Sequence, residues 1–429
     1  WSDGTTRMHG TIQATGGASG GDGGQIETSG KGSLDVAGSQ ISAKAPAGTN
    51  GQWLLDPSDI TVVHGSSNAL SGGIFDPATA SSIGDTQINN ALNGGTDVTL
   101  QTSGGTGGSG NITVNSTVVI ANTGGGARTL TFHADNAIAI SAGASLGGTA
   151  GNRLDLNFIA PAGTTLAGTL ANGTVTSTGG ALTATSGTLD GITLDTDLTI
   201  GLSDNLHLKN GLTFANNHVL NVGPGAGNGH SLLYYDNTQT ITGSGQIVFG
   251  AASGYTSFLE ANSNNGSILT LDTGITLAAK AGPTGNVQLG ANTYDKIVNQ
   301  GTITANQSGY TFTTYGTFTN AAGAHLNVSA GTFTLGNSAA ATWSNAGTIA
   351  VSGGTLNLGG AIKTDNLGTI NQSATGIVNF VGTLDNTAAS NPTTAGTLNL
   401  STVGITNLVM VGGTLTGGTV TGAPITATS

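Results

Sequence analysis

The sequence predicts an all-β chain folded as a parallel β-helix, a solenoid in which short strands stack coil upon coil. Residues 97–102 and 128–133 alternate apolar and polar side chains, which is the pattern of a strand with one buried face. Glycine, asparagine or aspartate ends most stretches of this kind. Similar strand starts recur at Gly191, Gly211 and Ser231, about twenty residues apart, which is the length of one coil.

The composition agrees with stacked strands and excludes several other classes. Of the 429 residues, 74 are glycine, none is cysteine and only 7% are charged. Glycine has no three-residue period and proline occurs only 8 times, which excludes collagen. Disordered chains are highly charged and poor in β-branched residues, whereas threonine, valine and isoleucine abound here. A β-sandwich or barrel is the alternative fold, for which we would expect more regular two-residue turns.

The charge balance excludes some partners. The net charge is −12, with only nine lysines and arginines, so no basic face is available for nucleic acid. No apolar run approaches the length that crosses a bilayer, so we expect no membrane insertion. The chain begins at Trp1 rather than at a methionine, and we expect it to be a piece of a longer protein.

The segment after Trp53-Leu-Leu-Asp-Pro57 predicts a departure from the coil. We expect Trp53 and both leucines to fill the interior, and Pro57 to stop strand pairing and turn the chain outward. Residues 58–92 would then form a protrusion that leaves and rejoins the helix. Within them, residues 85–92 are the best helix candidate, with Asp85 as N-cap and Gly94 just past the end.

The second part of the chain, residues 161–429, is predicted to continue the stack as a degenerate repeat. One phrase occurs three times, as Asn299-Gln-Gly-Thr-Ile, Asn345-Ala-Gly-Thr-Ile and Asn366-Leu-Gly-Thr-Ile. Glycine and asparagine supply the left-handed backbone conformations that such corners need. Trp343, close to the second copy, is expected to point inward.

Residues 1–160 resemble the region that follows the secretion domain in filamentous-haemagglutinin-type exoproteins, the adhesins of bacterial two-partner secretion. The resemblance is densest over residues 16–160. It rests on the following segments: Gly20-Gly-Asp-Gly-Gly-Gln-Ile-Glu-Thr-Ser-Gly-Lys31, Lys31-Gly-Ser-Leu-Asp-Val-Ala-Gly38, Ile41-Ser-Ala-Lys44, Gly51-Gln-Trp-Leu-Leu-Asp-Pro-Ser-Asp-Ile60, residues 88–102 and Gly110-Asn-Ile-Thr-Val114.

This resemblance implies a right-handed parallel β-helix that is secreted and displayed on the bacterial cell surface. It also implies an outer-membrane transporter as export partner, and a role in adhesion, cell aggregation or biofilm formation. The Asn-Pro-Asn motifs of the family's secretion domain are missing, and Asn391-Pro392 stands alone. We therefore expect this piece to be part of the stalk, without the export signal.

No catalytic, cofactor-binding or metal-binding residues are predicted. Asp190, Asp195, Asp197 and Asp204 lie close together in the sequence and leave open a polysaccharide-degrading enzyme, since paired carboxylates perform general acid–base catalysis. Threonine pairs leave open an ice-binding protein as a weaker alternative. These pairs are Thr174-Val-Thr176, Thr183-Ala-Thr185 and Thr419-Val-Thr421.

The tyrosines are the candidate ligand surface. Consecutive strand residues face opposite sides, so of Tyr234 and Tyr235 one ring should point inward and one outward. An outward ring suits a glycan, a matrix polysaccharide or the surface of a host or neighbouring cell. Interior stacking of the aromatic rings is the competing interpretation. All six tyrosines fall between residues 234 and 315: Tyr234, Tyr235, Tyr255, Tyr294, Tyr310 and Tyr315.

Overall fold

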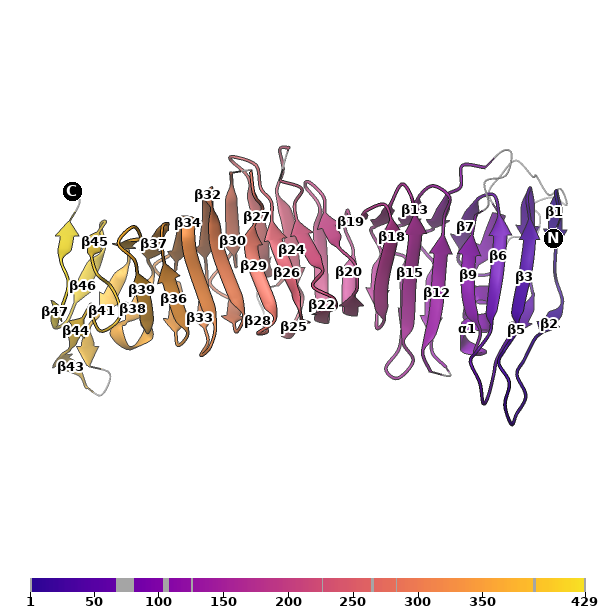
Figure 1. Cartoon of the computed structure of the whole chain (residues 1–429), viewed down its shortest axis with the longest axis horizontal. Helices are drawn as coiled ribbons and strands as arrows, with labels where there is room; N and C mark the ends of the chain where they lie inside the picture. Colours follow the sequence, from indigo (N-terminus) through magenta and orange to yellow (C-terminus); the bar gives the residue numbers. More distant parts are fainter. Residues whose placement is uncertain are drawn as a thin grey trace. The chain divides into compact units, whose positions relative to one another are not determined.

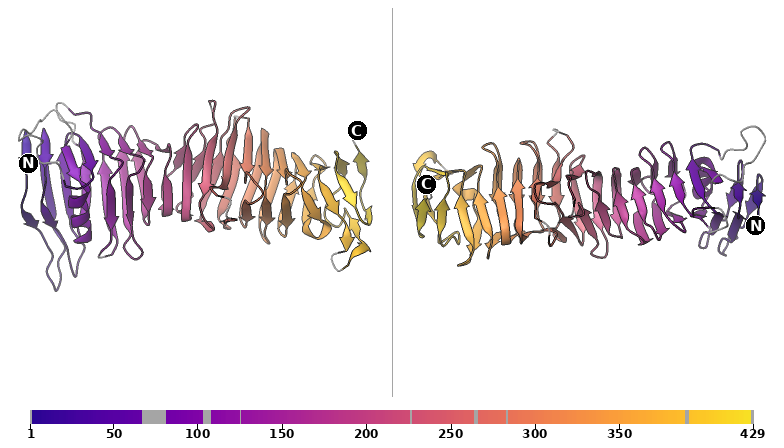
Figure 2. Two further views of the ribbon diagram at one scale, coloured as in Figure 1. Left: turned by 180° about the vertical axis from the view of Figure 1, so that it is seen from behind. Right: turned by 90° about the horizontal axis from the view of Figure 1, so that it is seen from above.

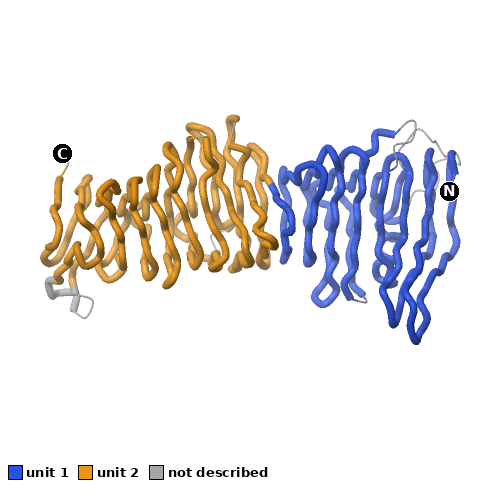
Figure 3. The backbone as a smooth tube through the Cα atoms, viewed as in Figure 1, with its two compact units in different colours: residues 1–198 blue, residues 199–429 orange. Residues whose placement is uncertain are grey.

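The computed structural model of the chain describes residues 2–66, 81–102, 108–124, 126–225, 227–263, 266–282, 284–388 and 391–427. The chain divides into two compact units, residues 1–198 and 199–429 (Figure 3). In each unit, nearly every strand pairs in parallel with strands of the neighbouring coils (Figures 1 and 2). The predicted all-β parallel β-helix is therefore confirmed for each unit.

Unit 1 consists of three columns of parallel strands, to which each complete coil contributes in turn. The first column contains β3 (Gln25–Gly30), β6 (Gln52–Pro57), β9 (Asp97–Gln101), β12 (Arg128–His133), β15 (Leu154–Ala160) and β18 (Thr174–Gly179). The second contains β8 (Ser81–Gly84), β7 (Ile60–Val63), β10 (Ile112–Val114), β13 (Ile138–Ile140), β16 (Thr164–Leu166) and β19 (Leu182–Ala184). The third contains β11 (Val119–Asn122), β14 (Ser145–Gly148), β17 (Thr169–Ala171) and β20 (Thr188–Leu194).

The first coils of unit 1 are formed by four short strands and the only α-helix of the described residues. The strands pair as β1 (Thr5–Arg7) with β4 (Ser33–Asp35), and β2 (Thr11–Gln13) with β5 (Gln40–Ser42). Helix α1 (Asp85–Asn93) packs on β5 and on β11, and Ile88 and Leu92 are fully buried. The helix thus takes the place of a strand in the third column.

Unit 2 has the same three-column plan, in which the long strands β22, β32 and β34 turn a corner and serve two columns. Its first column contains β22 (Asn205–Phe214), β24 (Ser231–Tyr235), β27 (Thr256–Ala261), β30 (Asn286–Leu289), β32 (Thr302–Thr314), β34 (His325–Leu335), β37 (Thr355–Leu358), β40 (Ile377–Phe380), β45 (Leu408–Met410) and β48 (Ile425–Ala427). The second contains β25 (Gln239–Gly243), β28 (Ile268–Leu271), β31 (Lys296–Asn299), β33 (Thr317–Asn320) and β35 (Thr342–Asn345).

The third column of unit 2 and the C-terminal coils complete the stack. The third column contains β23 (Val219–Val222), β26 (Gly245–Phe249), β29 (Ile275–Ala279), β36 (Thr348–Val351) and β39 (Thr369–Gln372). The last coils add β38 (Ala361–Lys363), β41 (Thr383–Asp385), β42 (Thr387–Ala388), β43 (Asn391–Ala395), β44 (Thr397–Asn399), β46 (Thr414–Thr416), β47 (Thr419–Thr421) and the 3-10 helix η1 (Thr364–Asn366). Strand β21 (Leu198–Ile200) lies where the division into units falls.

Inward-facing apolar side chains form continuous rows through each unit. In unit 1, Phe132 stacks on Phe158 of the next coil with ring centroids 5.5 Å apart. In unit 2, Phe312 stacks on Phe333 at 5.7 Å. Trp343 is almost completely buried, so its predicted inward orientation is confirmed. These rows bury the apolar face that a single coil leaves exposed.

The coils differ in length, and the regular twenty-residue spacing predicted from Gly191, Gly211 and Ser231 is wrong. Leu156 pairs with Val175, 19 residues later, whereas Gln239 pairs with Leu269, 30 residues later. Residues 232–235 pair with 205–208, while 212–214 pair with 241–243. The starts at Gly211 and Ser231 therefore belong to different columns, because turns of unequal length separate the strands.

Two expectations about residues 53–92 also change. Trp53 and Leu55 are fully buried, but Leu54 faces outward because side chains alternate along β6. Pro57 ends β6 in register with Gly30 and does not turn the chain out of the stack. Of the predicted protrusion, β7, β8 and α1 belong to the coils, and residues 67–80 lie outside the described residues. Gly94 ends the helix as predicted, but its N-cap is Gly84 rather than Asp85.

Asparagines stack at one corner of unit 2. Asn299, Asn320 and Asn345 occupy the same register position in β31, β33 and β35, and all three are buried. Two of the three repeated phrases in the sequence therefore mark this corner. The third phrase reaches the same corner, since Thr369 pairs with Thr348, but its Asn366 lies in η1 and does not join the asparagine row. Asn320, which lacks the full phrase, takes the middle position.

Candidate functional site

The structure separates the six tyrosines into rings inside the helix and rings on its surface. Tyr235 and Tyr310 are fully buried, so the prediction that they belong to a ligand surface is wrong. The Tyr235 hydroxyl accepts a hydrogen bond from the Lys296 backbone N–H at 3.2 Å and donates one to its carbonyl at 3.3 Å. Tyr310 bonds Ala251 in the same manner. Both are inward positions of their strands, where the interior rows need large side chains.

Tyr234 faces outward, as the alternation along β24 predicts, and stands in a row of polar groups. Register pairing places His207 of β22 beside Tyr234, and Tyr234 beside Glu260 of β27. The rings of His207 and Tyr234 stack with centroids 4.8 Å apart. The ring of His207 is held by Asp236, whose Oδ1 lies 2.8 Å from its Nδ1. An imidazole, a phenol and a carboxyl group therefore follow one another across three coils.

Burial makes the carboxyl and phenol groups of this row weaker acids than usual. Burial, followed by the charge of Asp295, raises the pKa of Glu260 to about 7. The pKa of Tyr234 is also raised, first by burial and then by the neighbouring Glu260 carboxylate. Burial raises the pKa of Asp295, and hydrogen bonds from the Ala291 and Asn292 backbone N–H groups oppose this rise. Near neutral pH, Glu260 can either donate or accept a hydrogen bond.

A second group of rings lies beside this row on the same outward side of the sheet. His230 contacts Tyr255 edge-on, with centroids 5.5 Å apart, and Phe258 at 5.6 Å. Leu232 and Phe258 pair in register. The serine before each of them and the leucine after each of them are buried, so Leu232 and Phe258 face outward. We call the outward surface of β22, β24 and β27 that carries these five rings the aromatic face: His207, His230, Tyr234, Tyr255 and Phe258.

The two remaining tyrosines lie apart from the aromatic face. Tyr294 is 54% exposed in the turn between β30 and β31. Tyr315 follows β32, and its hydroxyl accepts a hydrogen bond of 2.6 Å from Asn337 Nδ2. The sequence therefore identified two members of the aromatic face, Tyr234 and Tyr255. It missed the histidines, Phe258 and Glu260, which only the register of the coils brings together.

The chemistry available at the aromatic face is recognition of a flat, hydroxyl-bearing ligand. Partly exposed rings offer apolar surface with polar edges, and Glu260 adds one group that switches between donor and acceptor. In the described parts of the chain, no three His, Asp or Glu side chains are placed to hold a metal ion. Nor is any described helix long and apolar enough to cross a membrane.

The four aspartates considered for catalysis do not fall in one unit. Asp190, Asp195 and Asp197 belong to unit 1, and Asp204 belongs to unit 2. Comparisons with protein-family models and with curated proteins found no match to this chain. The functional assignment therefore rests on the geometry of the residues and on the resemblance of residues 1–160.

Proposed function

We propose that this chain is part of the stalk of a secreted bacterial surface adhesin, and that it binds glycans without cleaving them. The observation that carries the glycan-binding part is the aromatic face, where five rings and Glu260 gather on three neighbouring strands of unit 2. Secretion, display on the cell surface and an outer-membrane transporter as partner rest on the resemblance to haemagglutinin-type exoproteins. The family assignment itself is part of this proposal.

The fold suits a spacer that also binds. Each coil contacts only its neighbours, so length is added without changing the cross-section. The backbone groups of each strand are paired on both sides, which makes the stack rigid along its axis. A rigid stack holds exposed rings in fixed positions, so little conformational entropy is lost when a glycan binds. Biofilm matrix polysaccharides and cell-surface glycans are the ligands we propose.

A binding assay with surface variants tests the proposal. The purified chain would be applied to a glycan array and to matrix polysaccharide, alongside Tyr234→Ala, Tyr255→Ala and Phe258→Ala. We expect each variant to weaken binding about five- to tenfold, because each removes a partly exposed aromatic contact. Tyr294→Ala is the matched control, since Tyr294 is exposed outside the aromatic face. Equal binding by all four variants would remove the aromatic face from the proposal.

One observation favours an enzyme as the second candidate. Glu260, whose pKa is raised to about 7, stands beside a tyrosine, and a general acid works best with a pKa near the operating pH. A polysaccharide-degrading activity would release reducing ends from a polymer incubated with the protein. Glu260→Gln would abolish that release while leaving binding measurable. Release of reducing ends that depends on Glu260 would replace the non-enzymatic proposal.

A further inference from the structure

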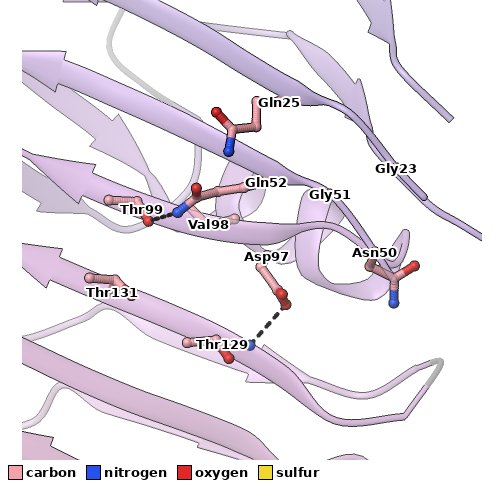
Figure 4. Close-up of a pocket in the computed structure, with 10 residues that line it drawn as sticks. All are labelled: Gly23, Gln25, Asn50, Gly51, Gln52, Asp97, Val98, Thr99, Thr129 and Thr131. Carbon is pink, nitrogen blue, oxygen red and sulfur yellow. Dashed lines mark hydrogen bonds between the residues drawn. The ribbon is translucent and has the colours of Figure 1, made fainter. Parts of the chain in front are cut away.

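A polar groove crosses the outward side of the first column of unit 1 and shares no residue with the aromatic face. It has a volume of ≈ 380 Å³, within the range of about 300–1,000 Å³ found for small-molecule sites. Figure 4 shows its side chains on β3, β6, β9 and β12. The lining residues are Gly23, Gln25, Asn50, Gly51, Gln52, Asp97, Val98, Thr99, Thr129 and Thr131.

The register of the strands sets the polar groups of the groove in two rows. Gln25 pairs with Gln52, and Gln52 pairs with Asp97, which gives a row of two amides and a carboxylate. Thr99 and Thr131 pair in the parallel row. Neighbouring strands lie about 4.8 Å apart, so groups of like chemistry repeat at about the length of one sugar ring. The rows thus present a regular template to an extended chain.

Each row offers hydrogen-bonding groups to a ligand. Gln25 is exposed, and an amide carries two donor hydrogens and an acceptor oxygen. The Gln52 amide donates to Thr99 Oγ1, which orients its oxygen. Asp97 accepts the Thr129 backbone N–H at 2.9 Å and keeps further lone pairs. Hydroxyl groups both donate and accept, so this mixture of amides, hydroxyls and a carboxylate complements a sugar.

The charge of the groove selects against acidic polymers. Asp97 is the only residue with a charged side chain among the described residues that line it. Arg128 lies next to Asp97 in the coil above but is itself 8% exposed, so it offers no open cation. Burial raises the pKa of Asp97, while the Thr129 N–H and Arg128 lower it. Among the lining side chains, an anionic glycan would therefore meet a carboxylate and no cation.

Two glycines at one end of the groove pack closely against neighbouring backbone. A Cβ on Gly23 would lie 1.9 Å from the Ala43 carbonyl oxygen, and one on Gly51 would lie 2.0 Å from the Gly24 carbonyl oxygen. Both positions therefore require glycine, because the backbones of successive coils approach closely there. Backbone and the Asn50 side chain therefore line this end of the groove (Figure 4).

We infer that the polar groove of unit 1 is a second glycan-binding site, one that takes an uncharged linear polysaccharide through hydrogen bonds alone. The aromatic face of unit 2 stacks rings against its ligand, whereas the lining of this groove contains no aromatic side chain. The two sites therefore recognise their ligands by different chemistry. A substitution that abolishes binding at one site can leave binding at the other intact.

Affinity electrophoresis of the whole chain tests this inference. Native gels would contain hydroxyethylcellulose, dextran or a galactomannan as neutral polymers, and polygalacturonate as the anionic one. We expect retardation by at least one neutral polymer and less by polygalacturonate. The double variant Gln25→Ala, Gln52→Ala should bind about tenfold more weakly, since it loses two sets of amide hydrogen bonds. Gln246→Ala, an exposed glutamine of β26, is the matched control and should bind as the wild type does.

The remaining variants separate the groove from the aromatic face. Gln25→Ala alone removes an exposed side chain, so this variant should fold as the wild type does. We expect it to weaken retardation, but less than the double variant does. Tyr294→Ala, at an exposed tyrosine outside both sites, should leave retardation by every polymer unchanged. If the Gln25, Gln52 double variant migrates as the wild type, if no neutral polymer retards the chain, or if only Tyr234→Ala abolishes retardation, the groove is not a glycan site.

Discussion

The side-chain amide of Asn320 donates a hydrogen bond of 2.8 Å to Oδ1 of Asn345, its partner one coil further along unit 2. Asn299 donates to Asn320 Oδ1 in the same manner, also at 2.8 Å. Each amide also reaches a backbone carbonyl of the following corner, His325 from Asn299 and Thr348 from Asn320. The stacked amides therefore bond both to one another and to backbone carbonyls of the next corner.

Replacing the middle asparagine should destabilise unit 2. Asn320→Ala leaves the amide of Asn299, Oδ1 of Asn345 and the Thr348 carbonyl without their buried partner, and we expect a loss of about 2–3 kcal/mol. Asn379→Ala is the control, since Asn379 donates to Asn357 Oδ1 at 2.9 Å on the outward side of β40. Its loss should be about 0.5 kcal/mol, because water replaces the lost partner. Urea unfolding followed by tryptophan fluorescence would measure the unfolding free energy of both variants. Equal losses would show that burial does not make the Asn320 hydrogen bonds more important than those of Asn379.

Stability should depend on pH through Glu260. A glutamate in an unfolded chain has a pKa near 4.5, whereas in the folded chain burial and Asp295 raise the pKa of Glu260 to about 7. Between these values the unfolded chain binds fewer protons than the folded chain, so the free energy of unfolding falls as the pH rises. Glu260→Gln cannot ionise and should be more stable than the wild type by about 1–2 kcal/mol at pH 8.

The difference between wild type and Glu260→Gln should disappear at pH 4, where both side chains are neutral. Thermal unfolding at half-unit steps from pH 4 to pH 8 would measure it. Parallel profiles for the two proteins would show that the Glu260 carboxyl is not perturbed by the fold. The same buffers would show whether glycan binding at the aromatic face changes in the same window.

Tyr234 and Tyr235 should behave oppositely although they are neighbours in sequence. Tyr235→Ala empties a fully buried position and should cost about 3–5 kcal/mol. Tyr235→Phe keeps the ring but loses the bonds to Lys296 and should cost about 1 kcal/mol. Tyr234→Ala should change the unfolding free energy by less than about 1 kcal/mol and weaken glycan binding instead. Unfolding and binding measured on the same samples would contradict this division if both variants lost the same property.

The sequence predicts the fold well because the features that define it are local. Alternation marks nearly every strand, and the inward position of Trp53 and Trp343 follows from it. Register between coils is not local, since turns of different lengths separate Leu156 from Val175 by 19 residues but Gln239 from Leu269 by 30. The equal spacing at Gly211 and Ser231 was misleading for this reason.

The candidate site was predicted only in part, and for the same physical reason. Alternation along β24 separates Tyr234 from Tyr235, but it cannot place Glu260 beside Tyr234, because Glu260 follows 26 residues later, beyond β25 and β26. The burial of Tyr310 was equally hidden. Tyr310 lies in β32 just after a register shift between Asn306 and Thr311. This shift decides which of the following side chains face inward.

Asp85 should hold α1 in the stack of unit 1. Its carboxylate is 3% exposed and accepts hydrogen bonds from the His64 ring at 2.9 Å and from the Gly65 and Val119 backbone N–H groups at 2.8 and 2.9 Å. It therefore joins the start of the helix to the loop after β7 and to β11. Asp85→Asn turns one acceptor oxygen into a donor that faces a donor, and we expect a loss of about 2–4 kcal/mol in the free energy of unfolding.

Asp155→Asn is the control, because Asp155 is partly exposed and accepts the Thr174 N–H at 2.7 Å. Its loss should stay at about 1 kcal/mol. Hydrogen exchange of the α1 amides would report the effect locally, with faster exchange in Asp85→Asn only. Unchanged protection of α1 in that variant would mean that packing of Ile88 and Leu92 is sufficient to hold the helix.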